Sequence, residues 1–186
     1  ARKHLSLPEN QKVILFFGII RKYKGLKLLL KAVSKMKDKT DLTLIVAGEF
    51  YEDRNVYTKL IEKLKLQNHV IVNAGFVDKY KVKYYFSAAD IVAQPYLSAT
   101  QSGVTQIAYH FDTPMLVTNV GGLPEMVPHG KVGYVCEPTA ESVATALSSF
   151  FANNDGPTFV ANMQEEKKRF QWGHFAKEIE RLALSL

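Results

Sequence analysis

Two polar segments carry residues whose types and spacing suit the binding of an anion. The first, Thr100-Gln-Ser-Gly103, combines hydroxyls with a glycine directly before an apolar, helix-like run. The first N–H groups of a helix have no partner inside the helix, and its dipole is positive at that end, so a phosphate placed there is stabilised. Taken alone, this segment predicts an anion site of unspecified function.

The second segment, Gly18 to Gly25, supplies positive charge. It follows an apolar run and places Arg21 and Lys24 within about one turn of each other. Two cations at that spacing suit a diphosphate. Spacing alone supports a diphosphate-binding loop and a solvated loop with Lys24 at a helix start about equally, because surface loops can be functional or merely solvated.

The composition is that of an ordinary globular domain. The chain has 186 residues, of which 47% are hydrophobic and 23% charged, enough for one well-buried core. A net charge of +6 is compatible with an anionic ligand, a nucleic acid or an acidic membrane surface. Lysines and arginines are nevertheless spread at the spacings of solvated helix faces, so a basic surface without a polymeric partner is favoured.

Further expectations concern location and processing. The single cysteine, Cys136, forbids an internal disulfide, suits a reducing cytoplasm and is expected to be buried. No apolar run approaches the roughly 20 residues that span a bilayer, so neither a signal peptide nor a membrane helix is expected. We expect the chain to be a fragment of a longer, cytoplasmic protein.

Apolar runs alternate with amphipathic segments along the chain. Strands are expected at 13–17, 42–47, 70–74, 91–94, 115–118 and 133–136. Helices are expected at 26–37, 56–65, 79–87, 104–110 and 140–152. This βαβ alternation predicts an α/β fold, a Rossmann-like doubly wound parallel sheet in a single domain, with ligands bound at the carboxyl ends of the strands.

A turn cluster at Asn153-Asn-Asp-Gly-Pro157 is expected to end the repeating part. We therefore divide the chain into a domain over residues 1–157 and a C-terminal helical tail over residues 158–186, which packs on or beside it. Trp172 and Phe175 are expected to tether that tail.

Six short motifs keep their order and spacing between residues 10 and 150. They are Gly18-x5-Lys24-Gly25, Val46-Ala-Gly48-Glu49, Val72-Asn-Ala-Gly75-Phe76-Val77, Ala88-Ala-Asp90-Ile-Val-Ala-Gln-Pro95, Pro114-Met-Leu-Val-Thr118 and Gly121-Gly-Leu-Pro-Glu125. Together they resemble the carboxy-terminal domain of the group 1 (family 4) retaining glycosyltransferases of the GT-B fold. One glycine pattern would be weak, but six motifs in order are specific.

The resemblance implies a donor site. It gives Lys24 a contact with the donor diphosphate and lets Arg21 substitute for the family's arginine, whose place Ile19 holds. It implies that the turn Gly75, Phe76 and Val77 cups the nucleotide base. It also implies that Gly18 and the segment Thr100, Gln101, Ser102, Gly103 and Val104 meet the phosphates, with Glu125 near the donor hydroxyls or orienting the turn before it.

The sequence departs from the family at its paired glutamates. Alignment on Pro114 places these two carboxylates at Ala99 and Ile107, where neither is present. Gln101 or Gln106 could supply the hydrogen bonds instead. A member that binds a nucleotide or another anion without catalysis is therefore the alternative to an enzyme.

Other functions have weaker support. A dehydrogenase would need Gly-x-Gly-x-x-Gly after the first strand, which is missing. The five histidines show no ligand spacing, so no metal site is expected. The resemblance implies no metal either, and no cofactor is expected because the nucleotide sugar is the substrate. The aromatic cluster Tyr80, Tyr84, Tyr85 and Phe86 would suit base stacking, but its helical spacing favours a core face, and no nucleic acid partner is expected.

The resemblance therefore implies the donor-binding half of a hexosyltransferase-type enzyme. The full-length enzyme would transfer a sugar from a nucleotide-sugar donor to a sugar, lipid or glycan acceptor held by an N-terminal domain. Without that domain the fragment would be inactive. The full-length enzyme is expected to associate peripherally with the inner face of a membrane, while the sugar, the base, the acceptor and the oligomeric state are not specified by the sequence.

Overall fold

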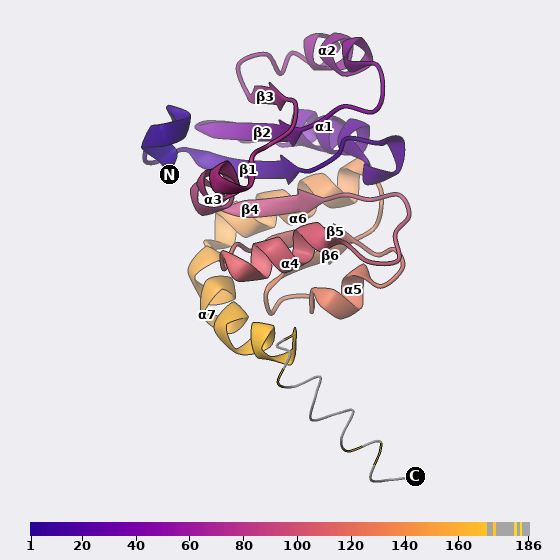
Figure 1. Cartoon of the computed structure of the whole chain (residues 1–186). Coiled ribbons are helices and arrows are strands. Elements are labelled where there is room, and N and C mark those ends of the chain that lie inside the picture. The colour runs from indigo at the N-terminus through magenta and orange to yellow at the C-terminus, as the bar shows by residue number, and fades with distance from the viewer. Residues whose placement is uncertain (171–172, 174–180, 182, 184–186) are drawn as a thin grey trace.

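A computed structural model gives the structure of the chain, and it describes residues 1–170, 173, 181 and 183. Six parallel strands form one sheet in the order β3-β2-β1-β4-β5-β6 (Figure 1). The strands are β1 (Lys12–Phe17), β2 (Leu42–Gly48), β3 (Val70–Ala74), β4 (Ile91–Gln94), β5 (Met115–Thr118) and β6 (Gly133–Cys136). This order confirms the doubly wound parallel sheet.

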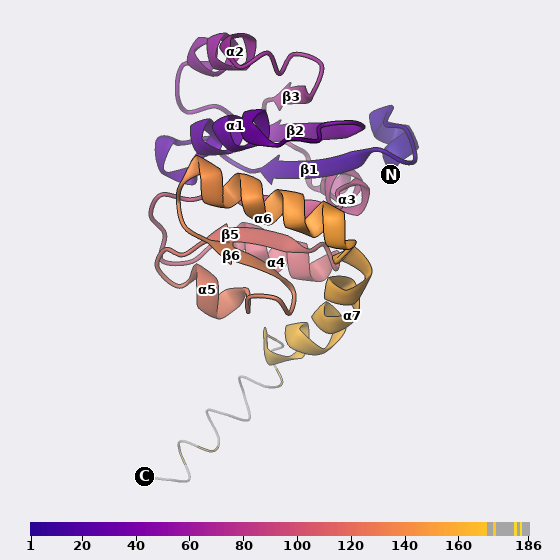
Figure 2. The same cartoon turned by 180° about the vertical axis from the view of Figure 1, so that it is seen from behind.

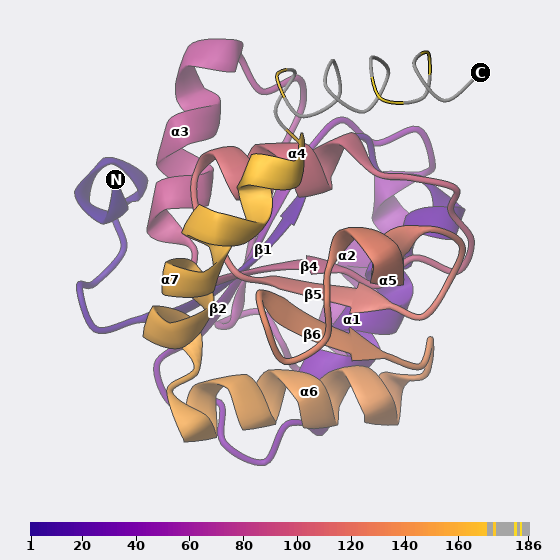
Figure 3. The same cartoon turned by 90° about the horizontal axis from the view of Figure 1, so that it is seen from below.

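Helices cover both faces of the sheet. They are α1 (Leu26–Lys35), α2 (Arg54–Lys63), α3 (Lys79–Ala88), α4 (Gly103–His110), α5 (Leu123–Met126), α6 (Ala140–Asn153) and α7 (Gly156–Glu166), with 3-10 turns η1 (Arg2–Leu5), η2 (Lys22–Lys24) and η3 (Lys167–Phe170). Viewed from behind, α1 and α6 lie in front of the sheet (Figure 2), and the view from below separates them from α3 and α4 across it (Figure 3).

Two apolar cores follow from the period-2 alternation of the strands. Ile14 and Phe16 of β1 point to the core beneath α1 and α6, whereas Val13 and Leu15 point to the core beneath α3 and α4. Strand β2 is buried along its whole length, as expected for a parallel strand covered on both faces. Side chains at the N-terminus of α2, α3, α4 and α6 accept a hydrogen bond from the first turn; they are Asp53, Asp78, Ser102 and Thr139.

The C-terminal part differs in detail from the expectation. Helix α7 begins at Gly156, inside the expected turn cluster, because Pro157 suits the first turn of a helix, where its missing N–H is not needed. Phe159 and Met163 of α7 are buried in the two cores. The tether residues Trp172 and Phe175 lie outside the described residues. None of the helices that are described is long and apolar enough to cross a membrane.

Candidate functional site

The loops after β1, β4 and β5 meet at the carboxyl edge of the sheet. Gly25, at φ 73°, lies so close to the next loop that a Cβ atom there would stand 1.8 Å from the carbonyl oxygen of Pro95. A Cβ atom on Gly121, at φ 52°, would stand 1.5 Å from the carbonyl oxygen of Ala99. Only glycine tolerates both the left-handed backbone and the close approach, so these two positions hold the three loops together.

Lys24 is the cation that this convergence places over the sheet edge. Its ammonium nitrogen lies 5.5 Å from the centre of the Tyr96 ring. The side chain is half-buried, and none of the carboxylates in the described part of the chain lies within ion-pair distance of it. Burial, and secondarily the charge of Arg21, lower the pKa of Lys24 below its ordinary value. Among the residues that the structure describes, Lys24 is therefore a desolvated cation without a carboxylate partner.

The first turn of α4 lies beside this cation. A Cβ atom built on Gly18 would be 3.2 Å from Lys24 Nζ and 3.7 Å from Val104 Cγ2. The Lys24 ammonium and the Val104 side chain therefore both lie close to the Gly18 backbone. Ser102 caps α4 by accepting a hydrogen bond from Val104 N at 3.3 Å. The N–H groups of Gln101 and Gly103 find no hydrogen-bond partner within the described residues, and both residues are exposed. These groups and Lys24 together can hold an anion.

A buried polar network, which the sequence analysis missed, supports this loop from below. Tyr96 is 3% exposed, and its hydroxyl lies 3.1 Å from Ser102 Oγ. Thr118 Oγ1 donates to the carbonyl oxygen of Tyr96 at 2.5 Å, and Thr105 Oγ1 donates to Gln94 Oε1 at 3.2 Å. Polar residues at the last position of β4 and just after it, in an otherwise apolar strand, are the signal that could have revealed the network.

The turn expected to cup a base lies in a separate hollow after β3. This hollow of about 370 Å³ is lined by Arg54, Val72, Asn73, Ala74, Gly75, Phe76, Val77, Lys81 and Tyr85. The Phe76 side chain is 85% exposed, so it stands beside the hollow rather than in the core. Gly75 has a positive φ of 123°, and nothing lies within 4 Å of the place where its Cβ atom would be. The Gly75 backbone is thus open to a ligand.

The remaining expected site residues have fewer contacts with Lys24 and the start of α4. Arg21 is exposed and its guanidinium stacks on the Tyr51 ring, 4.7 Å from the ring centre, in a second hollow at the same edge. Gln106 is exposed on α4, while Ile107 packs against the core, so the amide and the family's carboxylate position point in different directions. Thr100 lies in the loop, and its carbonyl oxygen accepts from Gly122 N at 3.0 Å.

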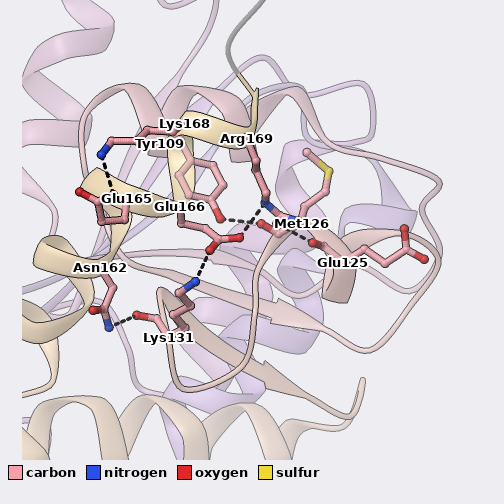
Figure 4. Close-up of polar contacts among 9 residues, drawn as sticks. All are labelled: Tyr109, Glu125, Met126, Lys131, Asn162, Glu165, Glu166, Lys168 and Arg169. Carbon is pink, nitrogen blue, oxygen red and sulfur yellow. Dashed lines mark hydrogen bonds and ion pairs between the residues drawn. The ribbon is translucent and has the colours of Figure 1, made fainter. Parts of the chain in front are cut away.

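Glu125 belongs to the short helix α5, where its carboxylate points away from the neighbouring ion pairs (Figure 4). Arg169 of η3 donates to the Glu125 carbonyl oxygen at 2.6 Å and pairs with Glu166 at 2.7 Å. Glu166 is buried and also receives Lys131 Nζ at 2.5 Å. These contacts tie the C-terminal segment to the helix that follows the Gly121 turn. Glu125 itself is exposed.

The aromatic cluster of α3 is divided between core and surface. Phe86 is fully buried, whereas Tyr80 is 70% exposed and Tyr84 stacks on His4 at 3.8 Å. The core interpretation is thus correct for Phe86 and in part for Tyr85, which is half-buried and packs against the same core. Cys136 is buried, as expected.

Two further features of the surface lie away from these loops. A hollow of about 620 Å³ at the opposite, amino edge of the sheet is lined partly by Arg2, Asp90, Phe111 and Pro157, and by none of the expected site residues. Within the described residues, no three His, Cys, Asp or Glu side chains gather where they could hold a metal ion.

Comparison with known proteins adds a family. The family profile described as "Glycosyl transferases group 1" matches residues 1–173. The chain is 26% identical to an uncharacterized glycosyltransferase of Methanocaldococcus jannaschii over 95% of this chain and 46% of that protein. It is 28% identical to the D-inositol 3-phosphate glycosyltransferase of Corynebacterium urealyticum over 100% of this chain and 46% of that protein. The chain thus spans about half the length of these relatives.

Solved structures share the fold. Anabaena HepE in complex with UDP-glucose superposes with a TM-score of 0.83 at 22% identity, over 100% of this chain and 51% of that chain. The C-terminal domain of a group 1 family protein from Francisella tularensis superposes with a TM-score of 0.78 at 21% identity, over 89% of this chain and 88% of that chain.

Proposed function

Since the chain belongs to the group 1 glycosyl transferases, as its motifs indicate, we propose that it is the donor-binding half of a hexosyltransferase and binds a nucleoside diphosphate sugar. The observation that carries the proposal is Lys24, a half-buried ammonium group without a carboxylate partner in the described residues, beside the first turn of α4. A folded protein gains little from a desolvated, unpaired cation unless an anion completes it.

The diphosphate fits this position on chemical grounds. Lys24 and the N–H groups at the start of α4 supply point charge and directed donors to the same small region. Arg21 lies near enough to lower the pKa of Lys24, so it adds to the positive potential there. The hollow at Gly75, Phe76 and Val77 then takes the base.

These residues would act on the leaving group. When the bond from the anomeric carbon to the diphosphate breaks, negative charge gathers on the phosphate oxygens. Lys24, Arg21 and the N–H groups near Ser102 would stabilise that charge, and fixed dipoles and cations are most effective where water is excluded. We propose that these groups neutralise the diphosphate without a resident metal, and that the sugar is transferred with retention.

We propose that glutamine amides, rather than carboxylates, bind the ribose of the nucleotide. Ala99 and Ile107 stand where the family's glutamates are expected, so Gln101 or Gln106 would supply this contact, Gln106 from a different direction than a carboxylate at position 107. An amide can donate and accept, so it can replace a carboxylate that only accepts from a ribose hydroxyl.

We also propose that a second domain of the full-length protein holds the acceptor. Exposed apolar side chains stand around the cationic loops at the carboxyl edge, namely Ile19, Tyr23, Tyr51 and Leu97. Exposed apolar patches commonly mark surfaces that another domain covers. Closure of such a cleft would bring the acceptor hydroxyl to the donor and exclude water, so the chain alone would bind donor without transferring sugar.

Calorimetric titration with UDP and UDP-glucose tests the proposal, because a homologous fold has been solved with UDP-glucose. Parallel titrations with other nucleoside diphosphates, each with added Mg²⁺ and with EDTA, identify the base and any metal requirement. Binding of one nucleoside diphosphate more tightly than its nucleoside is the expected result. Failure of every nucleotide and nucleotide sugar to bind would contradict a donor site. Nucleotide binding by a full-length protein that transfers no sugar would favour the non-catalytic alternative.

A further inference from the structure

We propose that Tyr96 is a positioning residue of the anion site, which holds the Lys24 ammonium and the start of α4 in the arrangement that a diphosphate requires. The inference rests on the proposed function and deepens it. Tyr96 is 3% exposed and does not reach the surface where a ligand would bind, so it acts through its neighbours.

The ring of Tyr96 faces the cation. Lys24 Nζ lies 5.5 Å from the ring centre, and Tyr23 packs edge-on against the same ring at 6.0 Å. An aromatic face attracts an ammonium group electrostatically. Unlike a carboxylate, the ring does not neutralise the charge that a phosphate needs. The ring therefore fixes Lys24 while leaving it available to a ligand.

The hydroxyl of Tyr96 reaches the other half of the site. It lies 3.1 Å from Ser102 Oγ, the atom that caps α4 by accepting from Val104 N. Burial raises the pKa of Tyr96 to about 12, so the phenol stays protonated and brings no negative charge near the phosphates. One side chain thus contacts both groups expected to bind the diphosphate.

The backbone of Tyr96 is fixed to the sheet. Its carbonyl oxygen accepts from Thr118 Oγ1 at 2.5 Å, and its N–H donates to the Gln94 carbonyl oxygen at 2.9 Å. Leu97 N, the next donor along the chain, bonds the Tyr23 carbonyl oxygen at 2.7 Å. The side chain is consequently held from β4, β5 and the Lys24 turn, which is what a residue needs to set the position of others.

Two substitutions separate the ring from the hydroxyl. Tyr96→Phe keeps the ring beneath Lys24 and removes the hydrogen bond to Ser102, whereas Tyr96→Leu removes both. UDP and uridine are titrated in parallel, because UDP uses the diphosphate groups and uridine does not. Tyr109→Phe is the matched control: Tyr109 is 2% exposed and its hydroxyl donates to the Met126 carbonyl oxygen at 2.7 Å, at the C-terminal end of α4 rather than at its first turn.

We expect Tyr96→Phe to weaken UDP binding about 3- to 10-fold, the usual effect of one lost hydrogen bond. We expect Tyr96→Leu to weaken it about 10- to 100-fold because the cation–π contact is lost as well. Uridine binding should stay within about twofold of wild type, and Tyr109→Phe should change neither ligand. If Tyr96→Leu fails to fold, the UDP and uridine affinities of Tyr96→Phe alone test the inference.

Unchanged UDP binding in Tyr96→Phe, or equal losses of UDP and uridine, would overturn the inference, because a purely structural role affects both ligands alike. An equal loss of UDP binding in Tyr109→Phe would overturn it too. If the wild-type protein binds no UDP at all, the proposed function fails and the inference fails with it. If the wild-type protein binds UDP and Tyr96→Phe binds it equally well, only the inference about Tyr96 fails.

Discussion

Replacing Lys24 by methionine should separate ligand binding from stability. The methionine keeps most of the stem over Tyr96 and removes only the charge. We expect UDP to bind about 10- to 150-fold more weakly, which corresponds to roughly 1.5–3 kcal/mol for one charge-assisted contact. The effect should be near the upper end because the ammonium is half-buried and has no competing carboxylate among the described residues.

The same substitution should not destabilise the ligand-free protein. The pKa of Lys24 is lowered in the folded state, first by burial and then by Arg21, so the folded chain holds the ammonium proton less tightly than the unfolded chain does. Wild-type stability therefore rises with pH as the pH passes from the folded pKa of Lys24 toward its unfolded value. Lys24→Met lacks this rise, and at pH 7 it should be at least as stable as wild type.

Lys27 provides the control. Its ammonium also lies 5.5 Å from an aromatic ring, but this is the ring of Tyr57 of α2 rather than that of Tyr96. Lys27→Met makes the same change of charge and should leave UDP binding unaltered. Calorimetry gives the affinities, and urea denaturation at pH 7 and pH 10 gives the stabilities. Weak binding together with a destabilised Lys24→Met protein would refute the reasoning, and so would equal losses of affinity in both variants.

Three other outcomes follow from the structure. Gly25→Ala should lower the free energy of unfolding, measured by urea denaturation, by about 2 kcal/mol or more relative to Gly130→Ala. Both glycines have a φ near 72°, but only Gly25 lies against Pro95. Equal losses in the two variants would contradict the close approach. Glu166→Gln should lower the free energy of unfolding by about 1–2 kcal/mol, a modest loss because both of its cationic partners are half-exposed. Amide hydrogen exchange should rise first in α7. Unchanged exchange in α7 would show that the ion pairs of Glu166 do not hold this segment. The buried thiol of Cys136, whose pKa burial raises to about 12, should react with iodoacetamide at pH 8 at least about 100-fold more slowly in the folded protein than in urea.

The sheet could be predicted from the sequence because its strands are mainly apolar runs bounded by glycine or polar residues. Strand β2, which is buried at every position, and strand β1, which is buried at its four central ones, leave no alternating pattern that would suggest a half-exposed sheet. The helix α5 was not predicted, since its four residues are too few to show any period. Helix α7 was placed too late because its proline reads equally as a turn signal and as a first-turn residue.

The candidate site could be predicted less completely. Lys24 and Ser102 follow strands that end at the same sheet edge, so topology alone brings them close. Tyr96 also follows a strand that ends at this edge, but its role depends on the distances from its ring to Lys24 and from its hydroxyl to Ser102, which the sequence does not give. Gln106 and Glu125 were chosen by alignment, and the structure leaves both exposed. Spacing along a chain predicts which loop a residue joins, but not which way its side chain turns.

The two edges of the sheet treat charge differently, and this contrast is itself an argument for the site. At the amino edge the cations are paired: Arg2 with Asp90 at 2.8 Å, Lys12 with Asp38 at 3.0 Å, and Lys167 with Asp112 at 2.7 Å.

At the carboxyl edge, Arg21 and Lys24 rest on tyrosine rings, and the charged groups that the structure describes provide them with no ion pair. A basic protein that had only to remain soluble would have no reason to desolvate one cation and leave it unpaired beside the start of a helix. The missing anion is best supplied by a ligand, and its charge would offset a cost that the fold alone does not recover.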